Sequence, residues 1–282
     1  MAAGASGSRW AGLCRPTAIV SGLGLACAAP AFGQTVSEVG PFVWTGAAGS
    51  NFSDGRNWST APAAPGAGDS AQIDAGSADV SSSATVARLS VGGGSLRIAS
   101  VLTTGEGTRL SAGWIAVLSD ARLVGSLTVT GGVFSNSGTL DGDLFLLGGS
   151  AVNDGGISGS TTVADASLAN NGTLRALSVQ TGGIVTNNSA GTVTGNTALA
   201  GGTLANNGRL ADVTVSAASI FTNNSGAIAG ILTNAGTSSN AGTLAALTNS
   251  GGSFTNNWGG VVSGLASISG GTVTNNATFA DV

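Results

Sequence analysis

Residues 136–140 read Asn-Ser-Gly-Thr-Leu, and the pattern returns at residues 153–157 (Asn-Asp-Gly-Gly-Ile) and 170–174 (Asn-Asn-Gly-Thr-Leu). The leading asparagine recurs at steps of 16 to 19 residues, as Asn136, Asn153, Asn170, Asn187, Asn206, Asn223, Asn240, Asn256 and Asn275. A steady period of this size is typical of a repeat architecture. Because a period of about 17 residues is too short for a pair of helices, and its residues favour strands and tight turns, it predicts stacked β-strands.

Composition agrees with a turn-rich β-protein. The chain has 282 residues, of which 48 are Gly, 42% are apolar and only 8% are charged. Regularly placed Leu, Val, Ile and Phe offer more burial than a disordered low-complexity segment has. All five prolines fall at or before Pro65, as expected if the later strands use all their backbone donors, so we place a boundary near residue 66.

The first 33 residues have the features of a secretory signal peptide. Arg9 and Arg15 supply positive charge, Thr17 to Ala29 form an apolar stretch too short to span a membrane, and small residues around Gly33 suit cleavage. We therefore expect an exported protein at the cell surface, in the outer membrane or outside the cell. Both cysteines, Cys14 and Cys27, lie in this segment, so the mature chain has no disulfide and no cysteine metal site.

The charge of the mature chain disfavours a nucleic-acid partner. Removal of Arg9 and Arg15 leaves seven Arg against thirteen acidic residues, a net charge of −6, and the chain contains no Lys. Binding to phosphates needs clustered basic residues, whereas these arginines are scattered singly.

An apolar residue follows the repeating asparagine and is expected to point inward. In most rungs it comes four residues later, as Leu140, Ile157, Leu174, Leu210, Leu244 and Phe279. In three rungs with a longer Asn-rich string, we place it one or two residues further, at Val193, Ile228 and Val261. The two kinds of rung alternate, so a super-repeat of about 35 residues overlies the rung.

These features predict an all-β fold, a parallel β-solenoid whose coils stack about 4.8 Å apart. Stacked asparagines can hydrogen-bond to the amides above and below, which predicts a structural ladder. A coil is either one rung or one super-repeat; we favour one rung, because the inward positions recur at the shorter step. The expected organisation is a signal peptide (1–33), a cap and entry to the solenoid (34–70), and β-helix repeats (71–282), clearest over 134–282.

Tryptophans stand out in a chain with few aromatics. Trp44 and Trp58 could stack on sugar, but we favour a role in plugging the N-terminal end of the solenoid, where an apolar cap is required. Trp258 lies in a corner string rather than at an inward position, and it is either an exposed contact or a packing residue.

The N-terminal part of the mature chain resembles a known family. Val43-Trp44-Thr45-Gly46, Asn57-Trp58-Ser59 and the run from Pro65 to Ile73 resemble the opening of passenger domains of bacterial autotransporters and related surface adhesins. With the rungs downstream, the resemblance covers essentially the whole mature chain. It implies a right-handed parallel β-helix displayed outside a Gram-negative cell, in adhesion or autoaggregation.

Autotransporters end in a membrane β-barrel, whereas this chain stops at Val282, inside a rung. We therefore expect a fragment, or a passenger that meets the membrane only through a translocator outside this chain. An incomplete last coil would expose strand edges and favour poor solubility or end-to-end association.

Residues for catalysis are sparse. Histidine is absent, which excludes a Ser-His-Asp triad and a His metal site, and Gly68-Asp69-Ser70 is interpreted as a turn. Asp141, Asp143 and Asp154 form the densest acidic group, with Asp141 and Asp143 expected on one strand face and Arg175 two rungs from Asp141. We interpret them as solvated turn carboxylates, and we expect no catalytic residue, cofactor or metal.

The leading hypothesis is a non-enzymatic surface rod whose Asn/Ser/Thr-rich face mediates weak multivalent adhesion or self-association. Its partner would be a host or bacterial surface, a glycan or another copy of the chain. The alternatives are a structural spacer that holds another module away from the cell and a carbohydrate-active β-helix.

Overall fold

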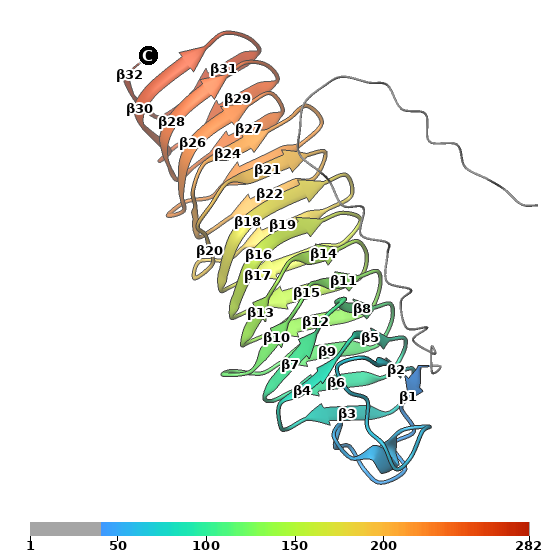
Figure 1. Cartoon of the computed structure of the whole chain (residues 1–282). Helices are drawn as coiled ribbons and strands as arrows, with labels where there is room; N and C mark the ends of the chain where they lie inside the picture. Colours follow the sequence, from blue (N-terminus) through green and yellow to red (C-terminus); the bar gives the residue numbers. More distant parts are fainter. Residues whose placement is uncertain (1–40, 282) are drawn as a thin grey trace, which may run out of the picture. The chain divides into compact units, whose positions relative to one another are not determined.

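Short parallel strands and the corners between them account for almost all of the described chain (Figure 1). The computed structural model describes residues 41–281; the expected signal peptide and both cysteines lie outside these residues. Within them, helical structure is limited to one short 3₁₀ helix, η1 (Gly55–Asn57). The prediction of an all-β parallel solenoid is confirmed, while the right-handed winding implied by the family resemblance stays a prediction.

Each coil passes through three faces, and equivalent strands of successive coils pair in parallel. Face 1 is a separate 12-stranded sheet with one strand per coil. Its strands are β3 (Ser77–Val80), β6 (Ser95–Ile98), β9 (Trp114–Val117), β12 (Val133–Asn136), β15 (Ser150–Asn153), β17 (Ser167–Asn170), β19 (Ile184–Asn187), β22 (Thr203–Asn206), β25 (Ile220–Asn223), β27 (Thr237–Asn240), β29 (Ser253–Asn256) and β31 (Thr272–Asn275).

Faces 2 and 3 together form the second sheet, of 20 strands. Face 2 contains β4 (Ala84–Val86), β7 (Val101–Thr104), β10 (Arg122–Val124), β13 (Thr139–Asp141), β20 (Thr192–Val193), β23 (Arg209–Leu210) and β32 (Thr278–Asp281). Face 3 contains β1 (Phe42–Val43), β2 (Ser70–Ile73), β5 (Arg88–Val91), β8 (Thr108–Leu110), β11 (Leu127–Val129), β14 (Leu144–Leu146), β21 (Thr197–Ala200) and β24 (Val213–Val215). Five longer strands run over both faces, namely β16 (Gly156–Val163), β18 (Thr173–Gln180), β26 (Ile228–Asn234), β28 (Thr243–Asn249) and β30 (Val261–Ile268).

One rung of the sequence is one coil of the structure. Asn136 pairs with Asn153 in the neighbouring strand, and each later ladder asparagine pairs with the next in the same way. The coils also begin earlier than the clearest rungs, because face 1 already starts at β3. The interpretation of one coil per rung is therefore correct, and the super-repeat is a difference between successive coils.

The core follows from strict alternation along the strands. In face 1 the second and fourth residues of each strand point inward, whereas the first and third point outward. Stacking brings apolar residues of successive coils into direct contact. The second residues of these strands, for example, form a buried row that is apolar except at Ser238: Ala78, Leu96, Ile115, Phe134, Ala151, Leu168, Val185, Leu204, Phe221, Ser238 and Phe254.

For two residues the prediction that they point inward is wrong. Ile228 is 38% exposed, and Val261 is only partly buried, whereas their C-terminal neighbours Ala229 and Val262 are 1% and 0% exposed and fill the core. In all three longer rungs the inward residue thus lies six positions after the ladder asparagine, as it does at Val193. The displacement is uniform at two residues.

A tight turn explains this uniform displacement. The N–H groups of Gly191, Ala227 and Gly260 each donate to the carbonyl three residues earlier, at 2.8, 3.1 and 2.8 Å. The turn loops two extra residues outward at the corner between faces 1 and 2. From Asn170 onward, the super-repeat therefore reflects corners that alternate between compact and looped.

Two threonines interrupt an apolar row of face 3. Thr161 is paired with Leu144 and Leu177, and Thr197 with Leu177 and Val213. Both side chains are buried, and neither hydroxyl has a hydrogen-bond partner among residues 41–281. Burial of an unpaired hydroxyl costs about 1–3 kcal/mol.

Thr161→Val and Thr197→Val are therefore each expected to raise the free energy of unfolding, by about 1 kcal/mol, in urea denaturation. Thr108→Val is the control, because the Thr108 hydroxyl donates to Thr104 Oγ1 at 3.3 Å and its loss removes a hydrogen bond. A loss of stability in the first two variants as large as in the control would contradict this expectation.

Candidate functional site

The nine sequence-predicted asparagines form one buried row along the solenoid. Each Nδ2 donates to the Oδ1 of the next asparagine, in eight successive hydrogen bonds of 2.7 to 2.9 Å. From Asn136 to Asn256 these side chains are at most 1% exposed, whereas Asn275 is exposed. The same Nδ2 atoms also reach corner carbonyls, such as Gly156 O at 3.0 Å from Asn136 Nδ2. We call this row the inner ladder.

The inner ladder replaces an aliphatic row. The equivalent inward positions of the first three coils hold Val80, Ile98 and Val117, all buried, and Val117 pairs with Asn136. Every side-chain amide in the ladder donates its hydrogen bond toward the later coil. Asn136, the first of them, has Val117 on the preceding coil, and a valine side chain has no donor to offer. Asn136 Oδ1 accordingly has no partner among the described residues.

Sequence reasoning missed two further sets of stacked polar residues. Asn234 and Asn249, at the ends of face-3 strands, are fully buried and joined by a hydrogen bond of 2.7 Å. On the outside of the corner after face 1, Asn188 donates to Asn171 and Asn171 donates to Asp154, each at 2.6 Å. This outer row donates toward the earlier coil, opposite to the inner ladder. Pairs of asparagines one coil apart were the available signal for both sets.

The structure places Trp44 and Trp58 in the buried cluster that precedes the first coil. They are 5% and 1% exposed and meet edge to face, with ring centroids 5.1 Å apart. Phe52 meets Trp58 in the same way at 5.0 Å, and its carbonyl accepts the Trp58 indole N–H at 2.8 Å. Phe52 N–H also donates to Asp79 O in β3, which joins the aromatic cluster to the coils.

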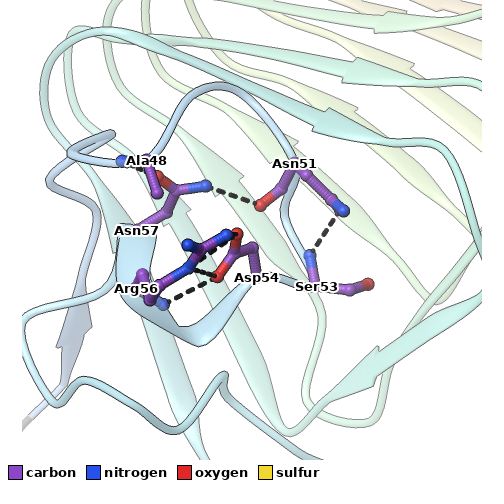
Figure 2. Close-up of polar contacts among 6 residues, drawn as sticks. All are labelled: Ala48, Asn51, Ser53, Asp54, Arg56 and Asn57. Carbon is purple, nitrogen blue, oxygen red and sulfur yellow. Dashed lines mark hydrogen bonds and ion pairs between the residues drawn. The ribbon is translucent and has the colours of Figure 1, made fainter.

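Polar contacts fix the loop around this cluster (Figure 2). The buried Asn57 side chain accepts from Ala48 N–H at 2.6 Å and donates to Asn51 O at 3.0 Å. Asp54 caps η1 by accepting from Arg56 N–H, and it also accepts two guanidinium N–H groups of the same arginine. The hydrogen bond from the Arg56 side chain is the main cause that lowers the pKa of Asp54.

The outer surface of face 1 is the most regular surface of the described chain. Each strand contributes two outward residues, and between β9 and β31 none of these side chains is charged. The third residues of these strands are small, and only partly exposed in most coils: Ala116, Ser135, Val152, Ala169, Thr186, Ala205, Thr222, Ser239, Thr255 and Thr274. The first residues are Ser or Thr except at Trp114, Val133, Ile184 and Ile220, which are 38%, 42%, 58% and 48% exposed.

Charge on face 1 is confined to its first two coils. Asp79 and Arg97 stand on neighbouring strands, and Arg97 Nη1 lies 3.1 Å from each carboxylate oxygen. The Arg97 side chain is exposed and that of Asp79 is partly exposed, so the pair adds little to stability. Beyond it the surface offers hydroxyl, methyl and larger apolar groups only.

Asp141, from the acidic group singled out in the sequence, is part of a row on face 2. It forms an ion pair with Arg122 on the preceding coil, and it accepts from the Ser158 hydroxyl at 2.8 Å on the following coil. The Ser158 hydrogen bond is the largest cause that lowers the pKa of Asp141, with Arg122 acting in the same direction. This carboxylate is held ionised and is not poised as a general acid.

The other two carboxylates have separate partners. Asp143 accepts from Ser160 N–H at 2.8 Å, and Asp154 accepts from Asn171 Nδ2 at 2.6 Å. Asp141 ends β13, whereas Asp143 lies in the corner before β14, so the expectation that they share one strand face is wrong. The chain turns at Gly142 between them. Within residues 41–281, no three His, Cys, Asp or Glu side chains gather as a metal site.

Two other sequence features have clear positions. Gly68-Asp69-Ser70 leads into β2, and Asp69 Oδ2 accepts from Gly66 N–H at 2.8 Å, as in a turn. Trp258 lies in one of the outward-looping corners and is 88% exposed. Of the two roles left open for it, the exposed position fits a contact residue.

A shallow hollow opens on face 2 beside Gly156. Its volume is about 300 Å³, and it is lined by Thr139, Gly156, Ile157, Ser158, Thr173, Arg175 and Thr194. These residues come from four successive coils, which stand side by side through the pairing of β13, β16, β18 and β20. We call this feature the Arg175 hollow.

Comparison with protein-family models, curated proteins and solved structures gives no match. Among the described residues, none of the helical structure has the length and apolar character needed to cross a bilayer. The site must therefore be interpreted from its own geometry.

Proposed function

We propose that this chain is a non-enzymatic rod of the autotransporter-passenger type, exported and displayed at the cell surface. Repeated weak contacts made by the rod attach cells to one another or to a host or bacterial surface. The observation that carries the proposal is the outer surface of face 1, where ten successive strands from β9 to β31 present uncharged side chains. A surface of this kind presents uncharged hydroxyl or apolar groups at every coil.

The area of face 1 suits a weak contact by each rod, made by many rods at once. Each strand has four residues with a rise of about 3.3 Å per residue, and the ten strands are spaced about 4.8 Å apart. Face 1 therefore has an area of roughly 600 Å². A stable protein interface buries about 800 Å² on each partner, so one rod on one partner falls in the range of transient complexes. Many rods on one cell would act together, because linked weak contacts sum to a strong attachment.

The acidic residues support a non-enzymatic role. Asp141, Asp143 and Asp154 each have a separate hydrogen-bond partner and lie at different positions of the coil. Glycoside hydrolysis needs two carboxyl groups that face each other across a substrate, whereas each of these three carboxylates is held by a hydrogen-bond partner of its own.

Cells that display the protein are expected to clump, or to attach to a surface, more than cells with the same display system and no insert. Clumping can be followed by settling of a cell suspension, with surface exposure checked by antibody labelling of intact cells. Equal settling of the two strains, with the rod labelled on the surface, would favour a spacer and contradict the proposal.

A further inference from the structure

Charge disappears from the solenoid after Asp212. Every arginine of the described residues, and every acidic residue except Asp281, lies at or before this position. Residues 213–280, which form β24 to β31 and most of β32, therefore carry no charged side chain on any of the three faces. A partner of these coils cannot be selected by charge, and covering their surface removes no charged side chain from water.

On face 2 large apolar side chains take the place of the charges. Arg209 is paired with Ile228 on the next coil, in an outward row. Asp212 Oδ1 accepts from Ile231 N–H at 2.9 Å, so Ile231 directly follows the last acid before Asp281. Both isoleucines are exposed, which is unusual for side chains of this size on a sheet with a well-filled core.

The apolar surface continues over the next two strands. Thr243 and Ala246 of β28 are paired with Ile228 and Ile231, and Leu265 on β30 is 61% exposed. Figure 1 shows β26, β28 and β30 side by side near the C-terminal end of the described chain. The small side chains of β28 leave the large apolar groups on either side of it uncovered.

Trp258 stands at the edge of this surface, in the looped corner that leads into β30. The equivalent positions of the other two looped corners hold Ser189 and Ser225. Because the corner loops outward, the indole projects beyond the sheet and is almost fully exposed. We call Ile228, Ile231, Trp258 and Leu265 together the Trp258 patch.

A lipid surface fits this combination of properties. Tryptophan concentrates at membrane–water interfaces, where its ring meets apolar chains and its N–H meets polar groups. Charged side chains would oppose entry into this layer, and the surrounding coils have none. The backbone of β28 is paired with β26 on one side and with β30 on the other, so lipid contact leaves this strand no unpaired edge.

We propose that the Trp258 patch docks the rod on an uncharged, zwitterionic lipid surface. The Trp258 indole lies among the headgroups, and the side chains of Ile228, Ile231 and Leu265 face the acyl chains. The attraction comes from apolar area and is therefore insensitive to salt. This activity is separate from the contacts proposed for face 1.

Two pairs of substitutions test the patch. Trp258→Ser with Leu265→Ser removes its two most exposed side chains, and serine is already the residue of the equivalent corners. Phe145→Ser with Leu147→Ser is the matched control, since it removes an aromatic and a leucine side chain that are exposed on an earlier coil. All four side chains are exposed, so both variants are expected to keep the urea midpoint of the parent protein.

The measurement is flotation of the purified mature protein with phosphatidylcholine vesicles in a density gradient, at low and at high salt. We expect the protein to float equally at both, the patch variant to bind about tenfold less, and the control variant to bind as the parent does. Vesicles of brominated phosphatidylcholine should quench part of the tryptophan fluorescence, and Trp258→Ser alone should remove most of this quenching.

Several outcomes would overturn the proposal: no flotation, flotation only with anionic vesicles or only at low salt, or equal losses in the two variants. Sedimentation of the protein without vesicles provides a further test. Self-association that the patch variant abolishes, together with absent flotation, would make the Trp258 patch an interface between copies of the chain. Flotation that persists in the patch variant would place the lipid contact elsewhere on the rod.

Discussion

Trp58→Ala is expected to lower the free energy of unfolding by about 3–5 kcal/mol, the range for removing a large buried aromatic side chain. Trp58 is 1% exposed, packs edge to face on Trp44 and Phe52, and donates its indole N–H to a backbone carbonyl. In a stack of coils each coil contacts only its neighbours, so an opened cap exposes the first coil to water. Urea denaturation measures the loss.

Trp258→Ala is the matched control, because the same side chain is 88% exposed there and its removal should change stability by about 0.5 kcal/mol or less. Hydrogen exchange should locate the effect of Trp58→Ala in β2 to β6, with β26 to β30 little changed. Equal losses at the two tryptophans would show that the aromatic cluster does not cap the coils.

Asn206→Ala is expected to cost about 3 kcal/mol, because it removes a residue from the middle of the inner ladder. Asn223 Oδ1 loses its donor, and Gly208 N–H loses its acceptor. Each buried group left without a partner costs about 1–3 kcal/mol. The neighbouring Asn207 carries the same side chain outside the core, where it accepts only from Asn224, so Asn207→Ala should cost about 1 kcal/mol or less.

The start of the inner ladder provides a second control. Asn136 already has an unpaired Oδ1 beside Val117, so Asn136→Val moves this unpaired carbonyl to Asn153 instead of creating another. Asn136→Val should therefore destabilise the protein much less than Asn206→Val. Equal losses at these two positions would mean that the hydrogen bonds of the ladder contribute little and that only side-chain volume matters.

Much of the fold could be predicted because a solenoid repeats its constraints in the sequence. The recurring asparagine marks one inward position of face 1 in nine coils, and its step equals the length of a coil. In the first coils the same position holds Val80, Ile98 and Val117, which do not stand out among other apolar residues. The repeats were therefore clear only from residue 134.

The errors arose where the sequence offers two equivalent choices. Ile228 and Ala229, like Val261 and Val262, are adjacent apolar residues, and only the length of the corner turn decides which one points inward. The Arg175 hollow could not be predicted, because its walls come from four coils and depend on their register. A single glycine in an outward row has no meaning until its neighbours in space are known.

Adding charge to one face of the rod, in cells that display it, is the decisive measurement. Ala169→Glu, Thr186→Glu and Ala205→Glu place three carboxylates on the outside of face 1, in neighbouring coils. Ser178→Glu, Ala198→Glu and Thr214→Glu place the same charges on face 3 of the same coils. If face 1 makes the contacts, the first triple variant should abolish clumping and attachment while the second retains them, with equal surface labelling. Clumping that survives the face 1 charges, or that is lost equally with the face 3 charges, would contradict the proposed role of face 1.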